Sequence, residues 1–132
     1  NKITADTKPQ WGKMDAAQLF AHCSEIQEVS NGKPLENTPW IAKLFKVMIR
    51  KMVINEKSYK HSTQTHPQYL KVDVEEFEAA KTRLLNALAK FKSENADGPS
   101  KHVHSFLGPM SHEEKGWSMY KHIDHHLSQF GV

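Results

Sequence analysis

The 132-residue chain is predicted to be an all-α protein, a four-helix bundle with one long crossover connection. Four segments each begin with a helix start signal and continue with apolar residues at spacings of three and four. No region alternates with period two for long enough to indicate a sheet. One polar stretch between two of the helices is long for a bundle connection. A chain of this length suits one domain, which we expect to cover residues 1–132.

The first two predicted helices occupy the N-terminal half of the chain. Asp15, followed by Gln18, matches a capping box, and Asn31-Gly32 marks the end of a helix over residues 15–30. Thr38-Pro39 is an N-cap followed by proline at the first helical position, and this second helix is expected to run to about Val53. In the first helix the stripe expected to face inward is Leu19, Cys23, Ile26 and Val29. In the second helix it is Ile41, Leu44, Phe45, Met48 and Met52.

The last two predicted helices follow the crossover. Asp73 with Glu76 opens the third helix, and the polar run 95–99 ends it. Ser111 with Glu114 caps the fourth, which ends before Gly131. The inward residues are expected to be Phe77, Leu84, Leu88 and Phe91, then Tyr120, Ile123, Leu127 and Phe130. The crossover, about residues 55–72, is interpreted as a strap across the bundle or as a functional loop, with a short extended piece at 68–72.

Composition limits where the protein works and what it contacts. No apolar run approaches the roughly 18 residues of a membrane-spanning helix, so neither a span nor a membrane partner is expected. The net charge of +3 does not by itself imply nucleic acid. The single cysteine, Cys23, excludes an internal disulfide and fits a reducing compartment, so we expect a cytoplasmic protein.

Three of the nine histidines form a candidate metal site. His122 and His126 lie one helical turn apart, so their rings point the same way and can share one ion. His22 falls on the apolar face of the first helix, where a buried imidazole needs a partner. Taken singly, each histidine is better explained as a structurally satisfied side chain. Only the combination favours a shared site, and the spacing alone leaves both interpretations open.

Other residues of the chain have expected roles at or near these histidines. Gln129 and Asp15 are candidates to support the site, Asp15 as a base, although an N-cap role already explains Asp15. Asp124 is expected at the surface, and Cys23 is expected to be a buried small apolar group. His104 is a candidate for shaping a cavity. Three further histidines are expected at surface or loop positions: His61, His66 and His112. The three tryptophans, Trp11, Trp40 and Trp117, are expected in the core or in cavity walls.

The ending His122-Ile-Asp-His-His126-Leu-Ser-Gln129 is similar to the H-x-x-x-H-x-x-Q signature of the DinB/YfiT-like superfamily of metalloenzymes. The resemblance to this superfamily covers nearly the whole chain. The segments that resemble a small branch of unknown function are Trp11-Gly12-Lys13-Met14, Ala21-His22-Cys23, Phe106-Leu-Gly-Pro, Trp117 and the Tyr120-to-Gly131 ending.

This resemblance implies a four-helix bundle, often dimeric, that binds a divalent metal through His22, His122 and His126. It also implies that the domain's first helix precedes Trp11 and is truncated here. Some superfamily members are thiol-dependent transferases or isomerases, so a low-molecular-weight thiol is an expected small-molecule partner. An ion held by three imidazoles keeps an open position, which makes hydrolysis equally accessible. Among the metals that suit imidazole, we expect zinc or nickel.

Two hypotheses from other functional classes stay open. One is a non-catalytic helical binding module, suggested by basic residues around the second helix: Lys43, Lys46, Arg50, Lys51, Lys57 and Lys60. Nucleic acid is the least favoured partner, because the chain has no Gly-rich phosphate loop and no recognisable helix-turn-helix. The other is a bundle whose histidines are relics of a lost activity.

Overall fold

The computed structural model describes residues 2–61, 63, 65–70, 76–94 and 102–132, and its described part is helical. The elements are α1 (Ala16–Ser30), α2 (Trp40–Leu44), α3 (Lys46–Ile54), α4 (Pro67–Leu70), α5 (Phe77–Lys92) and α6 (His112–Gln129). The described residues hold no strand, only an isolated bridge between His104 and Gly108. The predicted all-α class is therefore confirmed. None of the described helices has the length and apolar character needed to cross a membrane.

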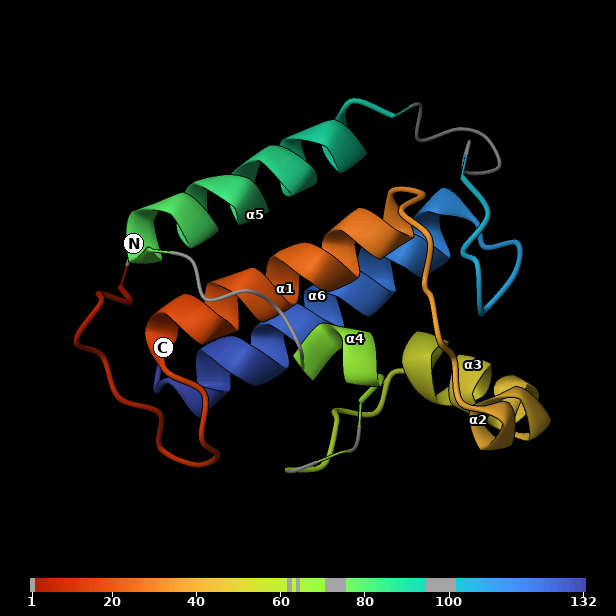
Figure 1. Ribbon diagram of the computed structural model, residues 1–132, viewed down its shortest axis with the longest axis horizontal. Helices are drawn as coiled ribbons and strands as arrows, with labels where there is room; N and C mark the ends of the chain where they lie inside the picture. The colour runs from red at the N-terminus through yellow and green to blue at the C-terminus, as the bar shows by residue number, and fades with distance from the viewer. Residues whose placement is uncertain (1, 62, 64, 71–75, 95–101) are drawn as a thin grey trace.

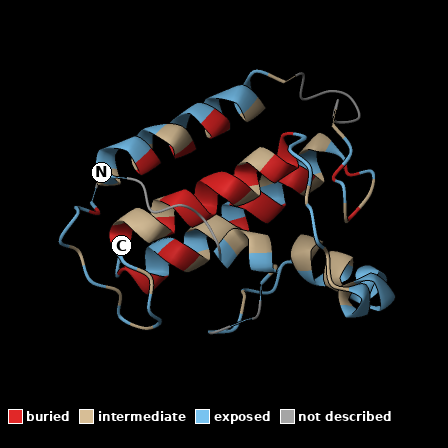
Figure 2. Ribbon diagram, in the orientation of Figure 1, coloured by how far each residue is buried: buried red, intermediate tan, exposed pale blue. Residues whose placement is uncertain are grey.

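The three long helices lie side by side, with α1 at the centre (Figure 1). One side of α1 packs against α5 and another against α6, while the one-turn helix α4 also contacts α1. Helix α3 packs on α6. Burial is concentrated along α1 and on the sides of its neighbours that face it (Figure 2). Helix α1 is thus the element against which the functional residues of the other helices are positioned.

Two of the three predicted helix start signals of this kind are present as capping boxes. Asp15 accepts a hydrogen bond from the Gln18 backbone N–H at 2.8 Å, and the Gln18 side chain accepts one from the Asp15 backbone at 3.0 Å. Ser111 and Glu114 form the same reciprocal pair at the start of α6. These bonds satisfy backbone donors that have no partner within a helix, which explains why both helices begin where the sequence predicts.

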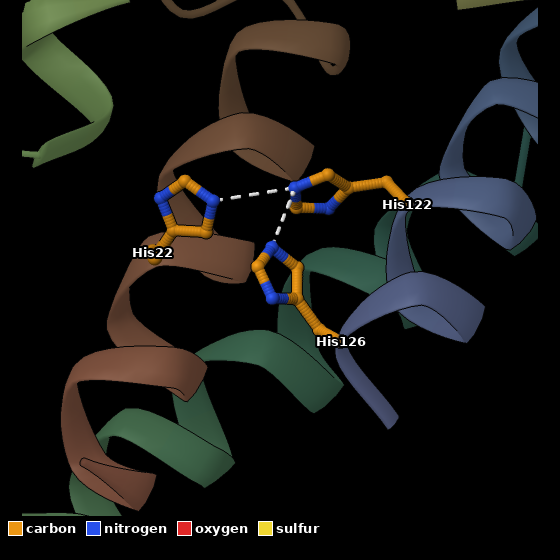
Figure 3. A group of neighbouring side chains, drawn as sticks. All are labelled: His22, His122 and His126. Carbon is orange, nitrogen blue, oxygen red and sulfur yellow. Dashed lines mark hydrogen bonds between the residues drawn. The ribbon is translucent and has the colours of Figure 1, made fainter. Parts of the chain in front are cut away.

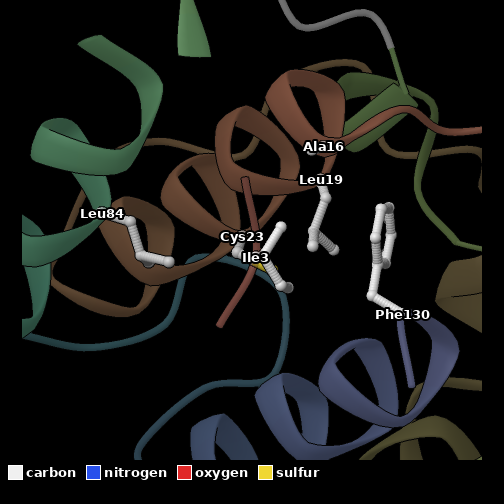
Figure 4. Packing of buried hydrophobic residues seen from close by; sticks show 6 residues of the cluster. All are labelled: Ile3, Ala16, Leu19, Cys23, Leu84 and Phe130. Carbon is white, nitrogen blue, oxygen red and sulfur yellow. The ribbon is translucent and has the colours of Figure 1, made fainter. Parts of the chain in front are cut away.

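A compact apolar cluster joins α1, α5 and the C-terminal end of α6 (Figure 4). Its buried members are Ile3, Ala16, Leu19, Cys23, Leu84 and Phe130. Burial raises the pKa of the Cys23 thiol to about 12, so the thiol stays protonated at neutral pH. As predicted, Cys23 acts as a small apolar core residue.

The second predicted helix differs most from expectation. It is broken at Phe45 into α2 and α3, and it begins after Pro39 without a side-chain cap from Thr38. No residue of either piece is buried, and Leu44 and Met48 are 69% and 60% exposed. Helical periodicity identified an apolar face correctly, but that face does not enter the core.

The inward face of α6 was predicted correctly only in part, because Phe130 is buried and Ile123 is half-buried. Tyr120 and Leu127 are exposed, whereas the buried or half-buried residues at three and four spacing are Lys115, Ser118, Met119, His122, His126 and Gln129. Polar members of this face have partners, because Lys115 Nζ donates to the Ser30 carbonyl at 2.8 Å and Gln129 bonds at both ends of its amide. This face therefore consists largely of polar groups that are paired in the folded chain, which an apolar pattern cannot reveal.

The crossover also contains a helix that the sequence did not suggest. Gln68, Tyr69 and Leu70 lie in α4 rather than in an extended piece, and positions 71 and 72 fall outside the described residues. Asp73, the predicted cap of the third helix, and the predicted end at 95–99 also lie outside them. Helix α5 itself begins at Phe77, with Glu76 as its N-cap residue.

Candidate metal centre

Three imidazoles from two helices converge between α1 and α6 (Figure 3). His22 Nε2 and His126 Nε2 each lie 3.2 Å from His122 Nε2. The three candidate ligand atoms all lie within 4.8 Å of one another. Tetrahedral ligands at the usual zinc–nitrogen bond length would be about 3.4 Å apart. The structure therefore brings together the three histidines that the sequence singled out, at a spacing that suits one ion.

His22 is oriented by the backbone of α4. Its Nδ1 lies 2.8 Å from the Tyr69 carbonyl oxygen, which can only accept, so Nδ1 carries the proton and donates. Helix α4 is held against α1 because the Gln68 amide donates to Glu25 at 2.8 Å. With the proton on Nδ1, the neutral ring of His22 presents the lone pair of Nε2 to the other histidines.

His126 is oriented by a chain of hydrogen bonds that ends on the N-terminal segment. The Gln129 amide nitrogen donates to the Trp11 carbonyl at 2.7 Å, which leaves the amide oxygen facing the His126 ring. His126 Nδ1 lies 2.8 Å from that oxygen and therefore donates to it. The lone pair of His126 Nε2 is consequently also directed at His122.

These two tautomers leave His122 between two acceptors. A proton on His122 Nε2 can be donated to His22 or to His126 at one time, not to both. Its other ring nitrogen, Nδ1, is buried and has no hydrogen-bond partner among the described residues. A cation shared by the three Nε2 atoms would satisfy every lone pair at once. The donor set and its fixed tautomers thus fit a divalent metal that prefers imidazole nitrogen.

Electrostatics keep these rings neutral. Burial lowers the pKa of His22, although its hydrogen bond to the Tyr69 backbone opposes this shift. Burial, with smaller contributions from the neighbouring histidines, holds the pKa of His122 well below its ordinary value. Burial likewise lowers the pKa of His126 to about 4. Neutral imidazole is the form that binds metal, and these rings are in that form at neutral pH.

A glycine allows the N-terminal segment to support this arrangement. The Gln10 backbone N–H donates to the Gln129 carbonyl at 2.7 Å, which docks the segment on the end of α6. Gly12 has a φ of +84°, and a Cβ there would lie only 2.4 Å from Gln129 Nε2. The backbone of Trp11-Gly12 can approach the Gln129 amide this closely only because no side chain intervenes.

The three histidines line one side of a cavity of about 690 Å³. Near them, Trp11, Tyr59 and His125 also line this cavity, and the His125 ring lies edge-on to both Tyr59 and Trp11. His125 is therefore a half-buried wall residue of the cavity. A ligand in the cavity would lie beside all three histidines.

The other predicted site residues have mixed outcomes. Asp15 serves as the N-cap of α1, and its carboxylate is engaged there rather than with the histidines. Asp124 is exposed, as predicted. His104 lines the cavity, and its Nδ1 accepts from the Leu107 backbone N–H at 3.1 Å. Burial and the nearby lysines lower the pKa of His104 to about 4, so its neutral ring keeps a proton on Nε2.

Residues assigned to the surface take part in more contacts than expected. His61 stacks on Trp11 with ring centroids 3.9 Å apart, and His66 lines the cavity. His112 stacks on Phe91 at 4.3 Å. Trp11 is a cavity wall as predicted, but Trp40 is 72% exposed and belongs to neither core nor wall.

Sequence reasoning missed two groups that orient the site. The Tyr69 and Trp11 carbonyl oxygens act through the backbone, so their side-chain types carry no signal of this role. Gly12 is the one clue that was present, since glycine beside a tryptophan suggests a close approach of backbone to another group. Tyr59 was not singled out either, although it lines the cavity beside His122.

Fold and site together define an all-α protein with a buried cluster of three neutral histidines beside an apolar cavity. Residues 3–131 match the family described as "Protein of unknown function (DUF1569)", and the chain belongs to this family. Comparisons with curated proteins and with solved structures gave no match.

Proposed function

We propose that this protein is a divalent-metal-dependent enzyme whose ion is held by His22, His122 and His126. The observation that carries the proposal is the pair of fixed tautomers, which direct two Nε2 lone pairs at the Nε2 of His122. Buried polar atoms are normally paired, and a shared cation would pair all three. The backbone carbonyl behind His22 and the amide behind His126 resemble the outer contacts that orient metal-binding histidines.

The ligand number supports catalysis rather than a structural role. Structural zinc sites have four protein ligands, whereas catalytic sites have three and an open position. When bound here, a divalent ion would act as a Lewis acid that activates a water or holds a thiolate. The cavity beside the histidines gives a small substrate room to reach that position.

The resemblance to the DinB/YfiT-like superfamily supports the same function. It favours a four-helix bundle with zinc or nickel, a low-molecular-weight thiol as a reaction partner, and a homodimer. The buried Cys23 thiol is not available for such chemistry, so the thiol would come from a bound molecule. Thiol transfer is therefore the reaction that we put first, with hydrolysis as the second candidate because an open metal site serves both.

Cobalt substitution tests this proposal. The tag-free protein loaded with Co²⁺ should show the visible absorption of a four- or five-coordinate site, and a small added thiol should introduce a sulfur-to-cobalt charge-transfer band. The His126→Ala variant should lose both signals, while His125→Ala should keep them. Visible absorption without any response to thiol would remove the thiol reaction, and identical spectra for wild type and His126→Ala would remove the site.

A further inference from the structure

The cavity beside the three histidines is rich in methionine. The chain contains five methionines, and all five line this cavity: Met14, Met48, Met52, Met110 and Met119. Methionine is flexible and polarisable, so surfaces rich in it adapt to apolar ligands of different shape.

The apolar face of α2 and α3 completes the wall. Ile41, Phe45 and Met48 line the cavity, yet they remain 50%, 49% and 60% exposed. With Met52 they make up four of the five residues of the stripe that periodicity predicted for the core, and the fifth, Leu44, is 69% exposed and does not line the cavity. The apolar character of these four residues fits a ligand-facing role, because their side chains border an open volume.

Charge is almost missing from the lining. Lys13 is the one charged side chain among the described residues that line the cavity, and no carboxylate does so. A phosphate-bearing or otherwise polyanionic ligand would find little compensation there. The volume of about 690 Å³ falls in the range of small-molecule sites.

We infer that the cavity binds a hydrophobic small molecule, with its aliphatic or aromatic body against the methionines and one polar end at the histidines. The position of the polar end rests on the proposed metal site. Binding of the apolar part of the ligand does not depend on the metal site, because the side chains that would contact it are Met48, Phe45 and their neighbours. Substrates of the proposed enzyme would therefore be lipophilic thiols or their adducts rather than highly charged metabolites.

A homologous ligand series tests the inference. Straight-chain hydroxamates, from acetohydroxamate to decanohydroxamate, carry a zinc-binding head and an apolar tail of graded length. Binding to the zinc-loaded protein, measured by calorimetry, should tighten about two- to fourfold for each added CH₂ until the cavity is filled. The heat-capacity change should become more negative along the series. Affinity that does not change with chain length would overturn the inference.

Two neighbouring positions on α3 supply a matched pair of variants. Met48 lines the cavity and is 60% exposed, whereas Val47 is 69% exposed and does not line it. Met48→Gln should weaken decanohydroxamate binding several-fold and leave acetohydroxamate unaffected. Val47→Gln should change neither. Equal effects of both substitutions would show that the long chain binds elsewhere.

The metal proposal and the cavity inference fail in different ways. Straight-chain alcohols bound to metal-free protein should show the same dependence on chain length, with weaker affinity overall. If the protein binds no zinc, but alcohol affinity still increases with alkyl-chain length and Met48→Gln weakens that increase, the metal site is wrong and the cavity inference stands. If acetohydroxamate binds the zinc-loaded protein but longer chains gain nothing, the inference is wrong and the metal site stands.

Discussion

The protonation of individual imidazoles is decided by atoms that lie outside the cluster. His22 is set by the Tyr69 carbonyl and His126 by the Gln129 amide, each through a bond of 2.8 Å. The side-chain amide of Gln129 has a single possible orientation, because its N–H group donates to the Trp11 carbonyl oxygen. Removing such outer contacts should disturb metal binding without removing a ligand.

Gln129→Leu tests this role of an outer contact. Leucine fills a similar volume but cannot accept from His126, so the ring loses the bond that fixes its tautomer. We expect metal affinity to fall by about 10- to 100-fold while one ion per chain still binds at saturation. Competition with a chromophoric chelator measures the affinity. Ser128→Ala, at an exposed position on the same helix, is the control and should be unchanged.

The lowered pKa values predict a stability that depends on pH in the metal-free protein. In the unfolded chain His126 titrates near its ordinary value of 6.5, but in the folded chain burial lowers its pKa to about 4. Below pH 6.5 the unfolded chain therefore binds protons that the folded site does not, and acid favours unfolding.

Urea unfolding in the presence of a chelator should show this dependence. The free energy of unfolding should fall as pH decreases from 6.5 to 4, by up to about 1.4 kcal/mol per pH unit for each such imidazole. His126→Gln removes one of these groups and should reduce the slope accordingly. A wild-type slope no steeper than that of the variant would contradict the assigned burial and protonation of the site.

At the scale of elements, the starts of α1 and α6 were predictable because local chemistry determines them. The capping boxes of α1 and α6 involve side chains three residues apart, so neighbouring sequence contains all the information. The destination of an apolar stripe is not local. The stripe on α2 and α3 has the same period as a core-facing one, but its opposite surface is a cavity. Periodicity therefore identified the apolar face without showing what it contacts.

Asp15 was a candidate base as well as a cap, and substitution can separate these roles. Asp15→Ala should lower the free energy of unfolding by about 1 kcal/mol. Asp15→Asn should lower it by only about a few tenths of a kcal/mol, because asparagine also caps helices. Metal content should match wild type in both variants. Asp124→Ala, at an exposed position on α6, is the stability control. If Asp15→Asn kept stability but lost thiol binding to the cobalt protein, the carboxylate would have a chemical role.

The candidate site was predictable in its side chains and not in its supports. Helical spacing placed His122 and His126 on one face, and the apolar surroundings of His22 indicated a need for a partner. The Tyr69 carbonyl could not be anticipated, because any residue at that position offers the same acceptor. The inward face of α6 was misjudged because it is lined by polar groups that are satisfied only in the folded chain.

At the scale of the whole molecule, the two ends of the chain meet at the site. Gln10 donates to the Gln129 carbonyl, and the Trp11 carbonyl accepts from the Gln129 side chain. His22 and His122 are separated by 100 positions in the sequence. Because these contacts exist only in the folded state, an ion bound there should stabilise the fold by mass action.

Gly12→Ala tests the docking of the N-terminal segment. The added Cβ would lie 2.4 Å from Gln129 Nε2, at a φ of +84° that alanine rarely adopts. We expect a loss of about 1 to 3 kcal/mol in the free energy of unfolding, together with weaker metal binding. Gly116→Ala, within α6, is the matched control, because the added Cβ would meet the Phe91 ring of α5 at an ordinary 3.7 Å. It should leave metal binding unchanged and stabilise slightly. Equal behaviour of the two variants would contradict the docking role.

Elemental analysis of protein prepared without a polyhistidine tag tests the central claim most directly. Wild type and His125→Ala should each retain about one divalent ion per chain after dialysis, and His22→Ala, His122→Ala and His126→Ala should each lose it. Circular dichroism would establish that the variants remain folded. A folded variant that lacks one of these three imidazoles but keeps the full metal content, or a wild type that binds no ion, would contradict the account.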